Sequence, residues 1–134
     1  MSRPTPRRII ETSLYVKDLD RAGKFYTEVL GLEVVTKKER RHLFLKAGKS
    51  MLLLFQPETT SSEQDTPHGA KGEIHFALEI ERGDLERWKQ TLLEQQVPIE
   101  SEVTWPNSAK SIYFRDPDRN SVELVTPGLW PIEG

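Results

Sequence analysis

Three side chains far apart in the chain are of kinds that bind divalent metal ions: Glu11, His75 and Glu123. The sequence has no cysteine, which excludes a thiolate metal site, a disulfide and a cysteine nucleophile. A metal site in this chain must therefore be built from imidazole and carboxylate groups. One histidine with two carboxylates leaves coordination positions open, which suits one divalent ion of iron, manganese, nickel, cobalt or zinc.

The positions of these residues follow from strands that alternate apolar and polar side chains. The strand predicted over residues 9–16 places its apolar side chains on one face, beneath a helix, and leaves Glu11 on the other face. The strands predicted over 73–80 and 121–125 leave the histidine and the second glutamate on the corresponding face. All three candidates therefore lie on the face of a sheet that is turned away from the helices.

The chain contains an internal repeat, in which residues 8–56 and 72–127 each follow the order β-α-β-β-β and residues 57–71 form a connecting loop. The repeat predicts an α+β fold of paired βαβββ modules in one domain, a cup-shaped mixed sheet with helices on the outside. One module alone exposes too much of its sheet to be stable, so the modules should pair. Helices are expected at 19–30 and 85–95, with strands near 9–16, 32–36, 42–46, 50–56, 73–80, 99–103, 111–115 and 121–125.

The repeat superposes Glu11 on His75 and Leu53 on Glu123. If a pseudo-two-fold axis relates the modules, these four positions meet on one concave surface, and three of them carry metal-ligand types. The alternative is that both glutamates face solvent and that the histidine is an ordinary sheet residue. A carboxylate inside a closed cup is costly unless it is paired or metal-bound, which favours the metal site.

Two other histidines are candidates for general acid or base catalysis. His42 begins the third predicted strand, and His68 lies in the loop just before the second module. The alternative for both is that they are solvated residues without a catalytic role.

Three further residues are candidates for substrate binding. Tyr113 and Arg115 are two positions apart on a predicted strand, should face the cup and suit an anionic or aromatic substrate. Alternatively, Arg115 pairs with Asp116 or Asp118. Trp105 is a candidate for a pocket wall.

Composition limits the class of partner. Hydrophobic residues make up 36%, charged residues 30%, and the formal net charge is −2, so the chain has the profile of a globular protein and not of a nucleic-acid binder. No segment has the apolar length of a signal peptide or a membrane span, so we expect a cytoplasmic protein that does not bind membranes. Residues 57–70, rich in Ser, Thr and Pro, predict a linker or an active-site loop with no regular element.

Three segments together resemble the vicinal oxygen chelate superfamily, which includes glyoxalase I, bleomycin-resistance proteins, fosfomycin-resistance thiol transferases and extradiol dioxygenases. They are LYVKDLDRAGKFYTEVLGLEVV at 14–35, GEIHFALEI at 72–80 and YFRDPDRNSVELVTP at 113–127. The resemblance covers the chain from residue 9 to about residue 127 and is specific for the fold. It implies the glyoxalase/bleomycin-resistance/dioxygenase fold.

The resemblance also implies a ligand set and a chemistry. The family's ligand positions match Glu11, His75 and Glu123. The additional glutamate of glyoxalase I falls on Leu53, which argues against a standard four-ligand glyoxalase I and leaves Leu53 to contact the substrate. Thiol transferases and dioxygenases typically use two histidines and one glutamate, so Glu11 departs from them. Shared family chemistry is metal chelation of adjacent substrate oxygens, with Glu123 also able to move a proton.

Two functions follow as hypotheses. The first is a metal-dependent enzyme on a small oxygenated molecule, either a glyoxalase-like isomerase or lyase, a thiol transferase or a ring-cleaving dioxygenase. The alternative is a metal-free protein of the bleomycin-resistance type that sequesters a drug; an accessory domain without a ligand is a third possibility. The family resemblance further implies a homodimer with sites shared between chains. The sequence does not name the substrate.

Overall fold

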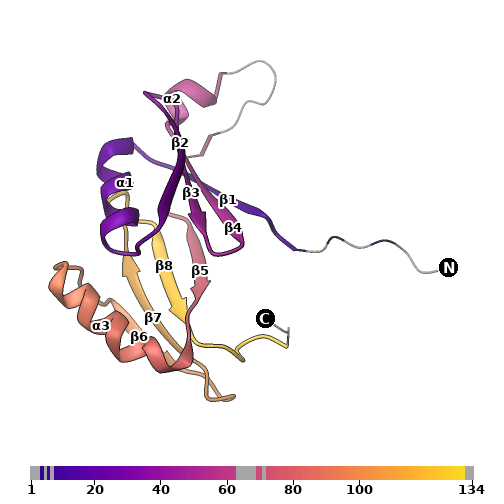
Figure 1. The fold of residues 1–134 in the computed structure, drawn as a ribbon, viewed down its shortest axis with the longest axis vertical. Helices are drawn as coiled ribbons and strands as arrows, with labels where there is room; N and C mark the ends of the chain where they lie inside the picture. The colour runs from indigo at the N-terminus through magenta and orange to yellow at the C-terminus, as the bar shows by residue number, and fades with distance from the viewer. Residues whose placement is uncertain (1–3, 5, 7, 63–68, 71, 132–134) are drawn as a thin grey trace. The chain divides into compact units, whose positions relative to one another are not determined.

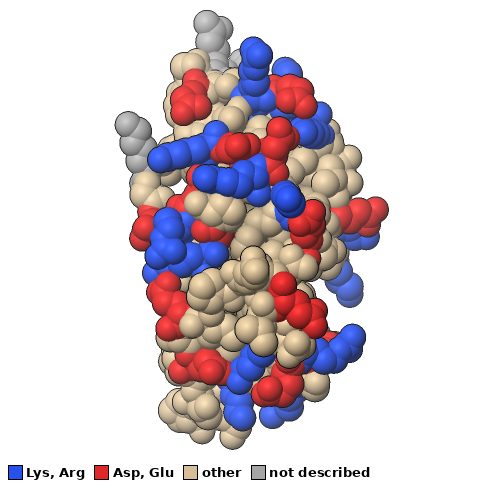
Figure 2. All heavy atoms as spheres, turned by 90° about the vertical axis from the view of Figure 1, so that its left-hand side faces the viewer, with Lys and Arg blue, Asp and Glu red and all other residues tan. Residues whose placement is uncertain are grey.

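The computed structural model describes residues 4, 6, 8–62, 69–70 and 72–131. The chain divides into two compact units, residues 1–71 and 72–134. Each unit contains one four-stranded mixed sheet with helical elements (Figure 1). The α+β class expected from the repeat is therefore confirmed. Figure 2 shows acidic and basic side chains interspersed over one face, in keeping with the formal charge of −2.

The first unit has the sheet order β1-β4-β3-β2. Strand β1 runs parallel to β4, and the β4–β3 and β3–β2 pairs are antiparallel. Its elements are β1 (Glu11–Tyr15), α1 (Leu19–Glu28), β2 (Glu33–Lys38), β3 (His42–Ala47), β4 (Ser50–Phe55) and α2 (Pro57–Thr60).

The second unit repeats this topology with the order β5-β8-β7-β6, and β5 is parallel to β8. Its elements are β5 (His75–Glu79), the 3₁₀ helix η1 (Arg82–Asp84), α3 (Leu85–Glu94), β6 (Ser101–Thr104), β7 (Lys110–Arg115) and β8 (Ser121–Val125). In both units the two parallel strands are joined by a long connection that contains a helix and the two other strands of the sheet.

Local sequence explains where helix α1 begins. The side chain of Asp18 accepts hydrogen bonds from the backbone N–H groups of Asp20 and Arg21, at 3.0 and 3.1 Å, and so caps the first turn. Gly23, on the buried face of the helix, lies so close to the Leu43 side chain that a Cβ atom there would collide with it. The absence of a side chain at this position lets α1 pack against β3.

The core of the second unit is formed by the apolar face of its sheet and by α3. Leu92 of α3 and Phe114 of β7 are both fully buried. Strand alternation places the fully or almost fully buried Ile112, Val122 and Leu124 on the same face as Phe114. The opposite face of this sheet carries His75, Ser111, Tyr113 and Glu123 together with the apolar Ala77 and Val125.

One expectation about the connection was wrong. A short helix, α2, occupies the start of the segment that the sequence indicated to be without regular structure. Pro57 stands in its first turn, where the missing N–H of proline costs nothing and its fixed φ suits a helix. His68 lies outside the described residues. Among the residues that are described, none of the helices combines the length and the apolar character required to cross a bilayer.

Candidate functional site

The polar face of the second unit brings two of the predicted metal ligands together. In the parallel β5–β8 pair, His75 is level with Ser121 and Ala77 is level with Glu123, so the two ligands are diagonal neighbours on one face. The Nε2 atom of His75 lies 3.2 Å from Oε1 of Glu123. The carboxylate side chain is only 7% exposed, whereas the imidazole is 50% exposed. The result is a buried acid with an accessible base beside it.

The other ring nitrogen of His75 fixes the orientation of the ring. Its Nδ1 lies 3.1 Å from the backbone carbonyl oxygen of Ser121. Because a carbonyl oxygen only accepts, Nδ1 must carry the proton in this hydrogen bond. A neutral His75 therefore presents the lone pair of Nε2 to the carboxylate of Glu123. Donation of the second ring N–H to a carbonyl is the usual arrangement of a metal-bound histidine.

The second oxygen of the Glu123 carboxylate is held by groups that the sequence analysis did not connect with it. The hydroxyl of Ser111, a residue only 1% exposed, lies 2.5 Å from Oε2 of Glu123. The indole Nε1 of Trp105 in turn donates to Ser111 Oγ at 2.9 Å. Trp105 was predicted to line a pocket wall, which stays a prediction, and its N–H reaches the hydroxyl beside the carboxylate. The alternation of residues 111–115 could have placed Ser111 on this face.

Tyr113 lies directly opposite Glu123 in the β7–β8 pair. Its ring stacks on the imidazole of His75, with ring centres 6.1 Å apart and planes inclined by 30°. Burial raises the pKa of the Tyr113 phenol above its usual 10.0, and the negative charge of Glu123 raises it further. The phenol is therefore protonated at neutral pH and available as a hydrogen-bond donor next to the acid.

Arg115, one pleat further along β7, is engaged in ion pairs. Its Nε and Nη2 atoms donate to the two carboxylate oxygens of Glu100 at 2.8 and 3.0 Å, and Nη1 lies 3.7 Å from Glu73. The hydrogen bonds from Arg115 lower the pKa of Glu100 below its usual 4.5. Most of the donor capacity of Arg115 is thus used within the unit. Its predicted contact with substrate stays a prediction.

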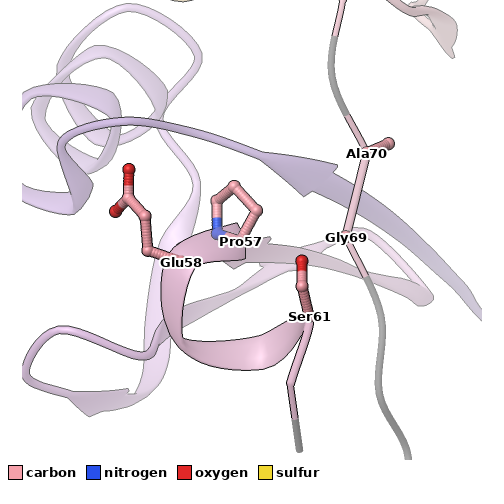
Figure 3. A pocket seen from close by; sticks show the side chains of 5 residues that line it. All are labelled: Pro57, Glu58, Ser61, Gly69 and Ala70. Carbon is pink, nitrogen blue, oxygen red and sulfur yellow. The ribbon is translucent and has the colours of Figure 1, made fainter.

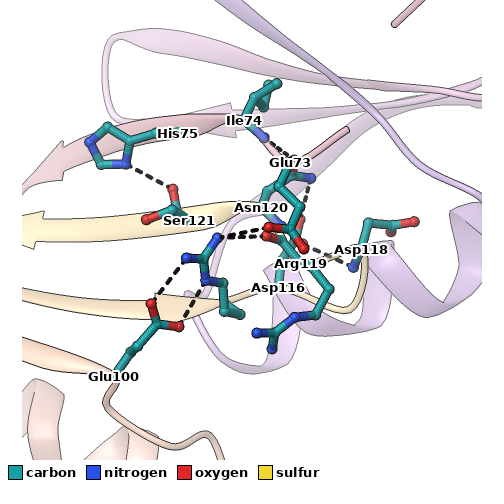
Figure 4. A network of polar contacts seen from close by, with 10 residues as sticks. Glu73, Ile74, His75, Glu100, Asp116, Asp118, Arg119, Asn120 and Ser121 are labelled. Atoms are coloured by element: carbon teal, nitrogen blue, oxygen red, sulfur yellow. Dashed lines mark hydrogen bonds and ion pairs between the residues drawn. The ribbon is translucent and has the colours of Figure 1, made fainter. Parts of the chain in front are cut away.

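A buried polar turn fixes the start of strand β5 (Figure 4). Asp116 accepts hydrogen bonds from the backbone N–H groups of Asp118 and Asn120 and from the side-chain amide of Asn120, at 2.8–3.0 Å. The side-chain oxygen Oδ1 of Asn120 accepts a hydrogen bond from the backbone N–H of Ile74 at 3.1 Å. Since Ile74 directly precedes His75, this turn helps to set the position of the histidine relative to β8.

The corresponding face of the first unit is lined mainly by aromatic and apolar side chains. A hollow of about 540 Å³ lies over it, and Glu11 is an exposed residue at its wall. Leu53, which is 8% exposed, occupies the position that Glu123 has in the second unit. The hollow is lined by Glu11, Ser13, Tyr15, Arg41, Phe44, Leu53 and Phe55.

His42 lies beside this hollow rather than among its lining residues. Its ring stacks on Phe44, with centres 4.0 Å apart, and its Nδ1 lies 2.6 Å from an Nη1 atom of Arg41. Because a guanidinium only donates, Nδ1 is the acceptor and the proton of a neutral His42 is on Nε2. The Arg41 guanidinium itself lies 5.8 Å above the ring of Phe55.

A second hollow of about 420 Å³ lies next to α2 and is lined by Pro57, Glu58, Ser61, Gly69 and Ala70 (Figure 3). It contains one carboxylate and none of the predicted ligands. Across the described part of the chain, no three His, Cys, Asp or Glu side chains are gathered as in a complete metal site. The residues that fit a metal best are therefore the His75–Glu123 pair, which offers one nitrogen and one oxygen donor.

The chain matches the profile of the Glyoxalase/Bleomycin resistance protein/Dioxygenase superfamily over residues 8–124. It belongs to this superfamily. The family membership predicted from three sequence segments is confirmed.

Several superfamily members are similar to the chain over most of its length. A crystal structure titled lactoylglutathione lyase, from Agrobacterium tumefaciens, is 40% identical with a TM-score of 0.91, covering 96% of this chain and 100% of that one. Metallothiol transferase FosB from Staphylococcus saprophyticus is 30% identical over 120 residues, covering 85% of this chain and 73% of FosB. Catechol-2,3-dioxygenase from Bacillus subtilis is 29% identical over 112 residues, covering 83% of this chain but 38% of the dioxygenase. The names of these superfamily members are those of a lyase, a transferase and a dioxygenase.

Proposed function

We propose that this chain is a divalent-metal-dependent enzyme acting on a small oxygenated molecule, with Glu11, His75 and Glu123 as the protein ligands of the metal. The observation that supports it most directly is the arrangement of His75 and Glu123. With Nδ1–H donated to the Ser121 carbonyl, a neutral imidazole and a carboxylate would face each other as two acceptors 3.2 Å apart. Such a contact is stable only with a proton or a cation between them.

Glu11 is assigned as the third ligand from the repeat. The strand registers show that Glu11 has the same position relative to β4 as His75 has relative to β8. We propose a homodimer in which Glu11 of one chain completes the site formed by the pair of the other, as expected from the family resemblance. Leu53 cannot act as a fourth protein ligand. Three protein ligands therefore leave coordination positions open for two adjacent substrate oxygens.

The chemistry proposed for the site combines the metal with groups of the chain itself. The ion would be iron, manganese, nickel, cobalt or zinc in the divalent state, and would supply Lewis-acid polarisation of the substrate oxygens. Glu123 Oε1 is the carboxylate oxygen that faces His75, and we propose that it accepts and returns a proton of the substrate. Tyr113 would donate a hydrogen bond to a substrate oxygen from its protonated phenol. His42, with its proton on Nε2, is proposed as a general acid.

The relatives favour a thiol compound as one reactant. Two of them are named a metallothiol transferase and a lactoylglutathione lyase, and glutathione is a thiol. We therefore propose a substrate that is a thiol conjugate, or an oxygenated acceptor to which a thiol adds. The compartment that we propose is the cytoplasm.

Metal binding is the decisive test. The purified chain should be stripped with a chelator, reloaded with each of the five ions in turn and analysed for metal content. We expect one ion per chain, lost in Glu11→Ala, His75→Ala and Glu123→Gln and retained in Glu79→Ala. Glu79 is the matched control because it is an exposed carboxylate on the same strand and face as His75. Absence of binding for all five ions would refute the enzyme proposal.

If metal binds, the loaded chain should be assayed with thiol conjugates, with oxygenated acceptors plus a thiol, and with catechols. Turnover of the catechols alone would replace the thiol proposal by a dioxygenase.

The hollow of the first unit supports a second candidate, which is metal-free sequestration of an aromatic or cationic drug. Three aromatic rings, those of Tyr15, Phe44 and Phe55, line it together with the carboxylate of Glu11. Under this alternative, ligand affinity would fall in Phe44→Ala and would be unaffected by chelators.

A further inference from the structure

The hydrogen bonds behind the Glu123 carboxylate have a fixed direction. An indole N–H can only donate, so Trp105 Nε1 donates to the hydroxyl oxygen of Ser111 at 2.9 Å. A hydroxyl has one proton, and its hydrogen bond to Glu123 runs from Ser111 Oγ as the donor to Oε2 as the acceptor at 2.5 Å; the Tyr113 phenol is a further hydrogen-bond partner of the same hydroxyl. The serine proton therefore points at the carboxylate. This oxygen accepts a hydrogen bond in a site that is almost completely buried.

The hydrogen bonds run in series from Trp105 to Ser111 to Glu123. Trp105, the first donor of this series, is held in place by the β6–β7 hairpin. The backbone N–H of Trp105 donates to the Ala109 carbonyl at 2.8 Å, and that of Ser108 donates back to the Trp105 carbonyl at 2.9 Å. The side-chain amide of Asn107 donates to the carbonyls of Gly128 and Leu129, beyond β8. The hairpin that carries the indole is thus tied to the segment that follows the strand of Glu123.

The fold does not require this series, because the first unit builds the same sheet without it. Strand registers make His42 the counterpart of Ser111 and Leu53 the counterpart of Glu123. Neither counterpart reproduces a hydroxyl-to-carboxylate bond. A buried serine directed at a buried carboxylate is therefore a feature of the second unit alone.

We propose that Trp105 and Ser111 are positioning residues that hold the Glu123 carboxylate by Oε2 and turn Oε1 toward Nε2 of His75. The proposal rests on the metal site proposed above, and it adds two residues that do not touch the metal or the substrate. Holding one oxygen fixes the rotation of the carboxylate. The other oxygen, Oε1, is then a single preoriented metal-binding atom beside the imidazole.

The test compares metal affinity in four variants of the full chain, by competition with a chromophoric chelator. Ser111→Ala removes the hydroxyl, and Trp105→Phe removes the indole N–H and keeps a smaller aromatic ring. Ser111→Thr and Ser111→Val have nearly the same size, but only threonine retains the hydroxyl. Matched controls are Ser101→Ala, at an exposed serine, and Trp88→Phe, at a half-buried tryptophan of α3.

We expect Ser111→Ala and Ser111→Val to weaken metal binding by roughly 10- to 100-fold, and Trp105→Phe by a smaller factor. Ser111→Thr should restore most of the loss, and the controls should bind as the parent does. The visible spectrum of the cobalt-loaded chain should change in Ser111→Ala, because carboxylate rotation alters the ligand geometry. Equal affinities and spectra across these variants would overturn the positioning role while leaving the metal site intact.

A second measurement separates this inference from the metal proposal. In the metal-free chain at one fixed pH, the ¹⁵N shifts of the His75 ring should change in Trp105→Phe and Ser111→Ala but not in Trp88→Phe. If the parent binds no metal, the proposed function fails, and these shifts alone decide the positioning role. Unchanged shifts in both variants would then overturn it.

Discussion

Asn120→Ala should weaken both the second unit and its metal site, because Asn120 links the turn at 116–120 to the strand of His75. Its side chain is 2% exposed and takes part in two hydrogen bonds, one to Asp116 Oδ2 and one from the backbone N–H of Ile74. Each lost bond costs about 1 kcal/mol, and leaving the Ile74 N–H without an acceptor adds about 1 kcal/mol or more. The expected loss in the free energy of unfolding is therefore about 3 kcal/mol.

Thermal and urea unfolding followed by circular dichroism provides the assay. A loss of about 3 kcal/mol corresponds to a decrease in Tm of roughly 10 °C for a chain of this size. Asn107→Ala is the matched control for stability, because the side chain of Asn107 also forms hydrogen bonds, in its case as a donor to two backbone carbonyls, but is exposed. Water can replace its bonds, so that variant should lose less than about 1 kcal/mol.

The Asn120→Ala variant also tests whether the turn at 116–120 positions His75. Ile74 directly precedes the histidine, so release of its N–H should let the start of β5 shift relative to β8. Metal affinity should fall by about 10-fold in Asn120→Ala and remain unchanged in Glu79→Ala, at the exposed carboxylate used as the control for metal binding. Equal stability losses in the two asparagine variants would refute the argument from burial, and an unchanged metal affinity would refute the positional link to His75.

Three further predictions concern pH and packing. Arg115 lowers the pKa of Glu100, so the native state favours the charged carboxylate and stability should decline as pH falls below 4.5. Glu100→Gln should make this decline shallower in urea unfolding measured as a function of pH. An unchanged decline would contradict the prediction. Burial raises the pKa of Tyr113, so stability should decline as pH rises above 10.0, and Tyr113→Phe should remove one tyrosine ionisation step above pH 10.0 in an absorbance titration. Gly23→Ala should lower the free energy of unfolding by about 1–2 kcal/mol, because a Cβ there collides with Leu43; a stabilised variant would show that helix propensity outweighs packing.

The sequence predicted most of the fold because its signals were local or periodic. The Asp18 cap, the alternation within strands and the repeat of both patterns in the second half were all sufficient to locate the elements within a few residues. Helix α2 was missed because a segment rich in Ser, Thr and Pro has no apolar periodicity, although Pro57 is a helix-start signal in its own right. A four-residue helix buries too little to leave a pattern.

The ligand pair of the second unit could be anticipated, but the groups around it could not. Alternation alone placed His75 and Glu123 on one face. Their contact and the contribution of Ser111 depend on strand pairing across separations of 48 and 12 residues, counted from 75 to 123 and from 111 to 123. Alternation could place Ser111 on this face, but it could not show that the serine hydroxyl reaches Glu123. Asn120 likewise had the appearance of an ordinary turn residue until its bond to Ile74 was known.

The repeat explains why one fold supports two different surfaces. At several equivalent positions of the two sheets, the first unit carries an apolar or aromatic side chain where the second carries a more polar one. In order along these faces, the pairs are Met51 and Ser121, Leu53 and Glu123, Phe44 and Tyr113, and His42 and Ser111. The apolar faces beneath the helices, in contrast, are similar in both units. Packing against a helix therefore places the same demand on both repeats, whereas the other face has no such common partner within its unit. A buried carboxylate and its hydrogen-bond donors lie in one unit and an aromatic hollow lies in the other, and this difference fits the proposed function, because that function requires a site for a cation and a surface for an organic molecule.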